Sequence, residues 1–253
     1  MIASLSCGFA ATLMLAVLVW AASLPLRDVS IVDIAWGWLV MTPAFVVAAR
    51  LPVTGPRTLV MLALGALWAL RLSGYIASRH RGEDRRYQAI RARNQPRFAF
   101  KSLYLVFALQ AALATIVALP FAGAIASAAP WNLLDAAGVA LFAAGFVIEA
   151  VADAQLARFK SNPASLNRVM DTGLWRYSRH PNYFGECCLW WGLWLVAAGA
   201  GAWWTIASPL LMTLLLLKVS GVTLLEREIE ERRPAYRDYV RRTNAFVPGV
   251  PRA

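Results

Sequence analysis

The chain has 253 residues and a formal net charge of +11, and 59% of its residues are hydrophobic while 15% are charged. Soluble domains are about 45–50% apolar and about 25% charged, so this composition excludes an ordinary soluble domain. The positive charge does not indicate a nucleic acid partner, because the basic residues gather in a few segments between long apolar runs. The composition therefore predicts a single integral membrane domain in contact with the lipid bilayer.

The apolar residues form seven successive runs, and about 20 apolar residues are enough for a helix to span the hydrocarbon layer. The first run is expected to be a structural helix rather than a signal peptide, because no Lys or Arg precedes it and it is too long. We therefore predict an all-α protein with about seven transmembrane helices, at residues 3–25, 30–49, 57–78, 102–122, 132–154, 183–199 and 203–224.

Three segments carry most of the positive charge. The segment Arg79–Lys101 contains eight Lys or Arg residues, Arg158–His180 contains five, and the tail from Glu226 onward contains seven. Loops rich in Lys and Arg remain in the cytoplasm. Seven spans with the N-terminus outside place all three segments, and the C-terminus, on the cytoplasmic side.

Ionisable residues inside the expected spans are candidates for function, because charge within a membrane is costly. Glu149 and Asp153 are four residues apart and share one helix face, and Lys160 follows on roughly the same face. This face is expected to point into the helix bundle or into a wet cavity. For Glu149 alone an interhelical ion-pair network and a ligand site are equally compatible with the pattern, whereas the whole set favours a ligand site.

The segment from Asp171 to Gly192 is the richest in polar groups. Pro181 is well tolerated at the start of a helix, so the sixth helix is expected to begin there. Arg176, Arg179 and His180 would then surround the helix N-terminus, and Arg side chains and helix N-termini both favour phosphate. Asn182 and Glu186 are four residues apart and are suited to hydrogen bonds with an amide or a ribose.

The residues Gly173–Glu186, GLWRYSRHPNYFGE, resemble the C-terminal signature of the steroid 5-alpha-reductase family. The chain is most similar to a bacterial branch of that family that is catalogued as a domain of unknown function, and VDIAWG at 32–37 and EDRRY at 83–87 also fit this branch. The resemblance covers nearly the whole chain. It implies seven transmembrane helices and an NADPH-dependent reduction of an activated carbon–carbon double bond. The shorter RHPNY piece is shared with isoprenylcysteine carboxyl methyltransferases and sterol reductases.

The resemblance also implies a set of cofactor contacts in the fifth span, the signature and the tail. They are Glu149, Asp153, Lys160, Arg168, Trp175, Tyr177, Arg179, His180, Asn182, Glu186, Glu228, Arg232 and Tyr239. Glu228 and Arg232 stand where the family has a His and a Tyr. No metal site is expected, because the chain has two His residues and no CxxC pattern.

Reduction of an enone places negative charge on the carbonyl oxygen, so the protein must provide a hydrogen-bond donor there. The position of the family's catalytic Tyr falls on Trp68, and the second span has no Gln-Glu pair. We therefore expect the donor to be Asp33, kept protonated by an apolar setting, or Tyr75, with Tyr87 as a further candidate.

These patterns divide the chain into an expected substrate half (1–122), a cofactor half (123–225) and an amphipathic cytoplasmic tail (226–253). The expected location is the bacterial inner membrane, with the cofactor side facing the cytoplasm. Two alternatives remain, a SAM-dependent methyltransferase of the isoprenylcysteine type and a non-catalytic lipid-binding protein. Clustered Arg residues favour NADPH, because SAM carries no phosphate. The substrate is expected to be hydrophobic, and the sequence selects neither its identity nor an oligomeric state.

Overall fold

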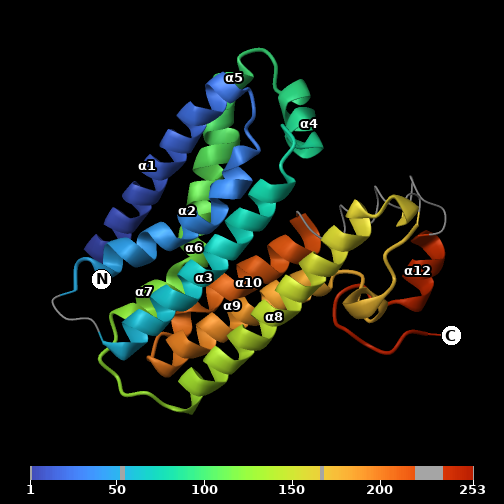
Figure 1. Cartoon of the computed structure of the whole chain (residues 1–253). Helices are drawn as coiled ribbons and strands as arrows, with labels where there is room; N and C mark the ends of the chain where they lie inside the picture. The colour runs from blue at the N-terminus through green and yellow to red at the C-terminus, as the bar shows by residue number, and fades with distance from the viewer. Residues whose placement is uncertain (1, 52–54, 166–167, 220–235, 253) are drawn as a thin grey trace. The chain divides into compact units, whose positions relative to one another are not determined.

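The computed structural model describes residues 2–51, 55–165, 168–219 and 236–252, and within these ranges it contains helices and connecting segments but no strand. The chain forms two compact units (Figure 1). Unit 1 consists of residues 1–131 and 197–207, and unit 2 consists of residues 132–196 and 208–253. The substrate and cofactor halves expected from the sequence meet at residue 122, whereas unit 1 continues to residue 131 and includes 197–207.

Unit 1 is built around helix α2, which packs against α1, α3, α6 and α7. Its helices are α1 (Ile2–Leu26), α2 (Ile31–Ala48), α3 (Pro56–Arg79), α4 (Arg85–Arg93), α5 (Phe98–Ser102), α6 (Leu109–Val117) and α7 (Leu119–Ile125). A π-helical segment, Leu103–Ala108, joins α5 to α6. The backbones of α2 and α3 approach closely at Gly37, where a Cβ would lie 2.8 Å from the Cα of Ala69.

Unit 2 contains the long helix α8 (Leu133–Ser161) and the helix α9 (Pro181–Gly199), together with α10 (Ala207–Leu214) and α12 (Tyr236–Arg242). Glycines set the contact between α8 and α9. A Cβ on Gly138 would lie 2.6 Å from the carbonyl oxygen of Gly192, and a Cβ on Gly145 would lie 2.5 Å from that of Gly185. The pairs are seven residues apart on both helices and run in opposite directions, so α8 and α9 are antiparallel.

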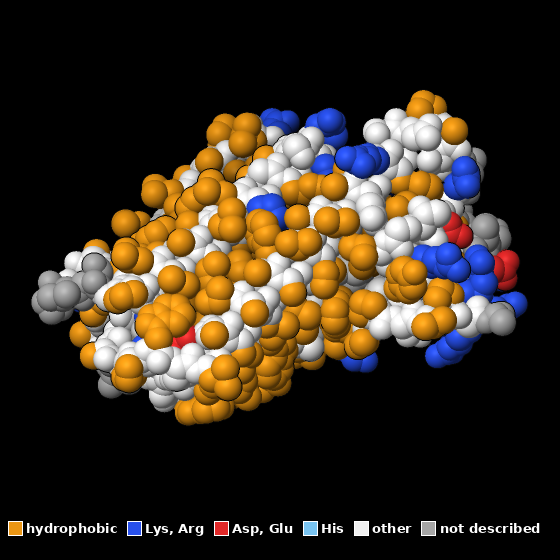
Figure 2. All heavy atoms as spheres, turned by 60° about the horizontal axis from the view of Figure 1, so that its bottom comes forward, with side chains coloured by type: hydrophobic (Ala, Val, Ile, Leu, Met, Phe, Trp, Pro, Cys, Tyr) orange, Lys and Arg blue, Asp and Glu red, His pale blue; other side chains and the backbone are white. Residues whose placement is uncertain are grey.

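Five described helical segments are long and apolar enough to cross a membrane, namely Ala3–Leu26, Ile31–Ala48, Pro56–Arg79, Phe98–Ile125 and Leu133–Ser161. Large apolar side chains are exposed on them, for example Met14, Leu59 and Val147, which are 64%, 61% and 59% exposed. Apolar side chains also cover much of the face drawn in Figure 2. These observations identify a helical protein with the character of an integral membrane protein.

The helix boundaries agree with the apolar runs to within a few residues, except where a helix continues beyond its run. The fifth expected span ends at 154, whereas α8 continues to Ser161 and therefore includes Lys160. The sixth helix begins at Pro181, as the sequence predicts. The seventh run is described as a 3-10 turn (Trp203–Ile206), α10 and a π-helical segment (Leu215–Val219), and its remainder lies outside the described residues.

Candidate functional site

The contact between α8 and α9 brings several polar side chains into the interior of unit 2. Glu149 and Asp153 on α8 are 2% and 5% exposed, and Glu186 on α9 is 8% exposed. The Nδ2 atom of Asn182, in the first turn of α9, donates a hydrogen bond of 3.1 Å to Oδ1 of Asp153. The expectation that Glu149 and Asp153 share a face directed into the helix bundle is confirmed, since both side chains are buried. The two helices therefore bury three carboxyl groups, and the half-buried amide of Asn182 contacts one of them, Asp153.

Asn182 contributes a further feature to this set. Its Oδ1 atom is buried and accepts no hydrogen bond from any residue that the structure describes. A buried acceptor that is left unsatisfied costs about 1–3 kcal/mol, so such an atom calls for an explanation. A ligand carrying an N–H or O–H group would supply the missing donor.

The signature loop before α9 is held by the C-terminal segment. Arg179 donates from Nη1 to the carbonyl oxygens of Val240 at 2.9 Å and Thr243 at 2.6 Å, and its backbone N–H donates to Asn244. The hydroxyl of Tyr239 donates to the carbonyl of Trp175. These bonds attach the tail to the loop. Arg179 and Tyr239 are also among the expected cofactor contacts, and that expectation stays a prediction.

Other expected cofactor contacts in unit 2 differ in their exposure. Trp175 is buried and donates from Nε1 to the carbonyl of Ala152 at 3.1 Å. His180 is also buried, and its ring stacks on Tyr183 with centroids 5.6 Å apart. The expected contacts at the exposed surface are Lys160, Arg168 and Tyr177. Glu228 and Arg232 lie outside the described residues.

A second polar set lies in unit 1, where the start of α2 meets α4. The hydroxyl of Tyr87 donates to Oδ1 of Asp33 at 2.7 Å, and Nη2 of Arg86 donates to Oδ2 of the same carboxyl at 3.0 Å. The side chain of Gln110 on α6 is also hydrogen-bonded to Tyr87. Asp33 was expected in an apolar setting that keeps it protonated. The structure adds two donors to this setting, one of them a cation.

Arg86 lies between two carboxylates. Its Nε atom donates to Oδ1 of Asp84 at 3.0 Å, and its Nη2 atom donates to Asp33. Burial lowers the pKa of Arg86, but the nearby Asp33 and Asp84 carboxylates raise it above the ordinary value. Burial and the Asp33 carboxylate both raise the pKa of Tyr87, so its phenol stays protonated. The cluster therefore contains a permanent cation and a neutral hydroxyl.

The third expected donor, Tyr75, lies on α3 close to its C-terminal end. Its hydroxyl accepts a hydrogen bond of 2.8 Å from Nη1 of Arg79, whose guanidinium also lies 4.8 Å from the centre of the Tyr75 ring. Tyr75 therefore contacts a basic side chain of the exposed helix end.

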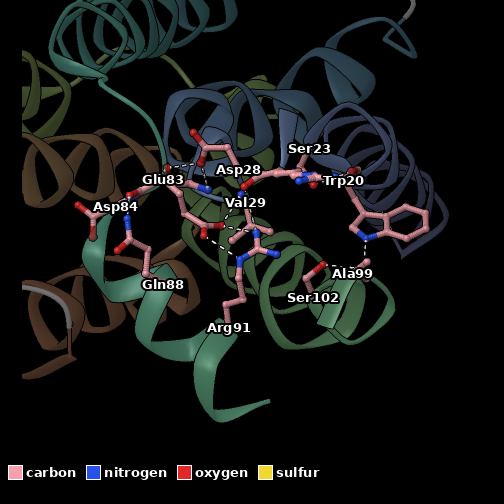
Figure 3. Close-up of polar contacts among 12 residues, drawn as sticks. Trp20, Ser23, Asp28, Val29, Glu83, Asp84, Gln88, Arg91, Ala99 and Ser102 are labelled. Carbon is pink, nitrogen blue, oxygen red and sulfur yellow. Dashed lines mark hydrogen bonds and ion pairs between the residues drawn. The ribbon is translucent and has the colours of Figure 1, made fainter. Parts of the chain in front are cut away.

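Sequence reasoning missed a neighbouring network that ties α4 to the turn between α1 and α2 (Figure 3). Glu83 accepts hydrogen bonds from Arg91 at 2.6 and 2.8 Å and from the backbone N–H of Val29 at 3.1 Å. Asp28 pairs with Nε2 of His80 at 2.8 Å and accepts from Ser30. The sequence feature that could have indicated this network is the presence of a few acids, such as Glu83, within a segment that is otherwise basic.

Comparison with known proteins adds the following findings. An uncharacterized protein of Schizosaccharomyces pombe is 27% identical over 279 aligned positions, which cover 95% of this chain and 78% of the relative. No solved structure matches the chain significantly. Residues 19–243 match the family described as "Protein of unknown function (DUF1295)". Because this match includes most of the sequence and both polar sets, the chain belongs to the DUF1295 family.

Proposed function

We propose that this protein is a membrane-embedded reductase that uses NADPH to reduce an activated carbon–carbon double bond in a hydrophobic substrate. The observation that carries the proposal is the polar set of unit 2 (Glu149, Asp153, Asn182 and Glu186), in which the buried Oδ1 atom of Asn182 has no hydrogen-bond donor among the described residues. The resemblance of the surrounding segment to the steroid 5-alpha-reductase signature connects this polar set to NADPH.

The groups of the polar set are suited to one part of NADPH. The carboxylates accept hydrogen bonds from ribose hydroxyls, and Oδ1 of Asn182 accepts one from the carboxamide of the nicotinamide. The phosphates need cations, and the exposed basic residues Lys160, Arg168 and Arg176 of the same unit can provide them. NADPH would supply the hydride, while the chain's own residues bind and orient it and exclude water.

The proposal extends to the membrane topology. Beside the five segments that qualify by length and composition, we assign α9 and the apolar helix Trp203–Lys218 as two further spans. An N-terminus outside the cell then places the basic segment after α3 and the signature loop in the cytoplasm, where NADPH is available. The bacterial inner membrane is the location that we propose.

The proposed reaction also needs a hydrogen-bond donor for the substrate oxygen. Tyr87, together with its acceptor Asp33, is favoured over Tyr75, because the phenol is 6% exposed and keeps its proton. Asp33 accepts the hydrogen bond of this hydroxyl and would position it.

The test is binding of NADPH, NADH and SAM to the detergent-purified full chain, measured by calorimetry. We expect NADPH to bind most tightly, because NADH and SAM lack its 2′-phosphate. Asn182→Ala should weaken NADPH binding about tenfold, the equivalent of one hydrogen bond of about 1.4 kcal/mol. Asn162→Ala, at the exposed end of α8 in the same unit, is the matched control and should leave the affinity unchanged.

Each of the other outcomes would support a different function for this chain. Selective binding of SAM would assign the chain to the membrane methyltransferases. Absence of binding by all three compounds would leave a non-catalytic lipid-binding protein. Equal NADPH affinity in Asn182→Ala and the wild type would remove the polar set of unit 2 from the cofactor site.

A further inference from the structure

The cluster of Asp33, Asp84, Arg86 and Tyr87 in unit 1 contains one donor that binds none of the residues the structure describes. Arg86 directs Nη2 to Asp33 and Nε to Asp84, each at 3.0 Å, and its plane lies against Tyr87 with Cζ 5.6 Å from the ring centre. These contacts fix the guanidinium from several directions. Its Nη1 atom donates to none of the described residues. The side chain is 39% exposed, so a ligand can reach this atom.

The neighbouring donor is already engaged. The hydroxyl hydrogen of Tyr87 is directed at Asp33 over 2.7 Å, so it must leave a carboxylate before it can bind another group. The Nη1 group of Arg86 has no such bond to break. Nη1 can therefore receive an oxygen atom without losing a bond, whereas Tyr87, the donor proposed above, must first leave Asp33.

The charges of the cluster define which oxygen it can receive. Two acidic groups, Asp33 and Asp84, are in hydrogen-bond contact with this one guanidinium. A second anion, such as a carboxylate or a phosphate, would be placed close to Asp33 and Asp84 and would be repelled. A neutral carbonyl oxygen meets no such repulsion and still accepts a charge-assisted hydrogen bond from the guanidinium.

The position of the cluster is suited to an amphipathic molecule. Asp33 is the third residue of α2, a helix that qualifies as a membrane span, so the cluster lies at the end of an apolar helix. The polar end of a lipid lies at this level, while its hydrocarbon chain continues along the apolar helix surfaces.

We propose that Arg86 is a substrate-binding residue whose Nη1 receives the carbonyl oxygen of an uncharged lipid, and that Asp33 and Asp84 exclude lipids with anionic head groups. The inference rests on the proposed reductase function, which it deepens by assigning the substrate to ketones, aldehydes and esters rather than free fatty acids or phospholipids. The donors expected from the sequence, Asp33, Tyr75 and Tyr87, do not include Arg86.

The experiment compares two probes of equal chain length, 2-dodecanone and dodecanoate, by thermal unfolding of the full chain in a neutral detergent. We expect 2-dodecanone to stabilise the wild type and dodecanoate to have a smaller effect. Arg86→Gln should weaken the binding of 2-dodecanone about tenfold or more. Arg86→Lys should also weaken it, because an ammonium group lacks the fork that bonds both carboxylates.

The adjacent, exposed Arg85→Gln is the matched control and should bind 2-dodecanone as the wild type does. Asp84→Asn should raise the affinity for dodecanoate, because it removes one of the two acidic groups that contact Arg86. The proposal is overturned if Arg86→Gln binds 2-dodecanone normally, or if the wild type prefers dodecanoate.

NADPH binding to the same preparations separates this inference from the proposed function. If NADPH does not bind while 2-dodecanone binding depends on Arg86, the reductase fails and the carbonyl site stands. If NADPH binds while 2-dodecanone binding is independent of Arg86, the reductase stands and the carbonyl site fails.

Discussion

The two polar sets of the molecule differ in how deeply their acidic groups are buried. In unit 1 acids and bases alternate, so that Asp33 pairs with Arg86, Glu83 with Arg91 and Asp28 with His80. In unit 2 three buried carboxyl groups lie on α8 and α9, and the buried cation Arg179 donates to backbone carbonyls of the C-terminal segment.

This difference bears on which of the two units has the stronger case for a bound ligand. In unit 1 ion pairs account for the carboxyl groups of Asp33, Glu83 and Asp28, and Nη1 of Arg86 is an exposed donor that binds none of the described residues. Unit 2 buries an acceptor, Oδ1 of Asn182, for which no described residue supplies a donor. The argument for a ligand is therefore stronger in unit 2, although the ion pairs of unit 1 are more conspicuous.

The largest loss of stability is expected from a substitution at the close backbone contact between α8 and α9, which positions the polar set of unit 2. In Gly185→Ala the new Cβ would lie 2.6 Å from the carbonyl oxygen of Gly145 and 2.7 Å from the backbone N of Glu149. Backbone atoms cannot move aside cheaply, so we expect a loss of about 3 kcal/mol in unfolding free energy, the upper end for overpacking. Denaturation in detergent measures it, and Gly74→Ala, which meets open space within α3, should instead stabilise slightly.

A smaller loss of stability is expected when the contact between the signature loop and the C-terminal tail of unit 2 is removed. Arg179→Gln removes the charged donor of two carbonyl groups, Val240 and Thr243, and should cost about 2 kcal/mol. Arg176→Gln, three residues earlier and exposed, should change the free energy of unfolding by less than about 0.5 kcal/mol. Equal effects of both substitutions would show that Arg179 does not hold the tail, and its role as a cofactor contact would then regain support.

The sequence predicts the helical membrane architecture well, because apolar runs and helix-starting residues such as Pro181 act locally. It also predicts that Glu149 and Asp153 share a buried face, which follows from helical periodicity. It could not predict that Arg179 would bind backbone carbonyls, since this depends on the path of the C-terminal segment. The pairing of Asp33 with Arg86 escaped prediction for a similar reason, because the two residues come from different helices and their approach is a tertiary contact.

The next effect tests whether charge pairing stabilises unit 1. Asp33→Asn keeps an acceptor for Tyr87 but removes the charge that faces Arg86, and we expect a loss of about 1–2 kcal/mol. The control is Asp238→Asn, whose partner Arg241 is 3.7 Å away in a pair that is 70–80% exposed. That change should cost less than about 0.5 kcal/mol. If the two substitutions have equal effects in thermal denaturation, Asp33 does not depend on its charge, and the apolar, protonated state expected from the sequence would be favoured.

The smallest effect concerns Asp84, which caps α4 by accepting from the backbone N–H of Arg86 at 2.9 Å. Asp84→Ala should cost about 1 kcal/mol at neutral pH, the usual effect of losing such a cap. Burial raises the pKa of Asp84, but the hydrogen bonds and charge of Arg86 outweigh it, so the folded-state pKa lies below the ordinary value of 3.8. The carboxylate therefore stabilises the fold fully above pH 3.8 and loses this contribution as the pH falls through the lowered pKa. The difference in unfolding free energy between the wild type and Asp84→Ala should accordingly be constant near neutrality and shrink in acid. A difference that stays constant through this acid range would mean that the cap does not need its charge. The charge of Asp84 would then not contribute to the stability of unit 1.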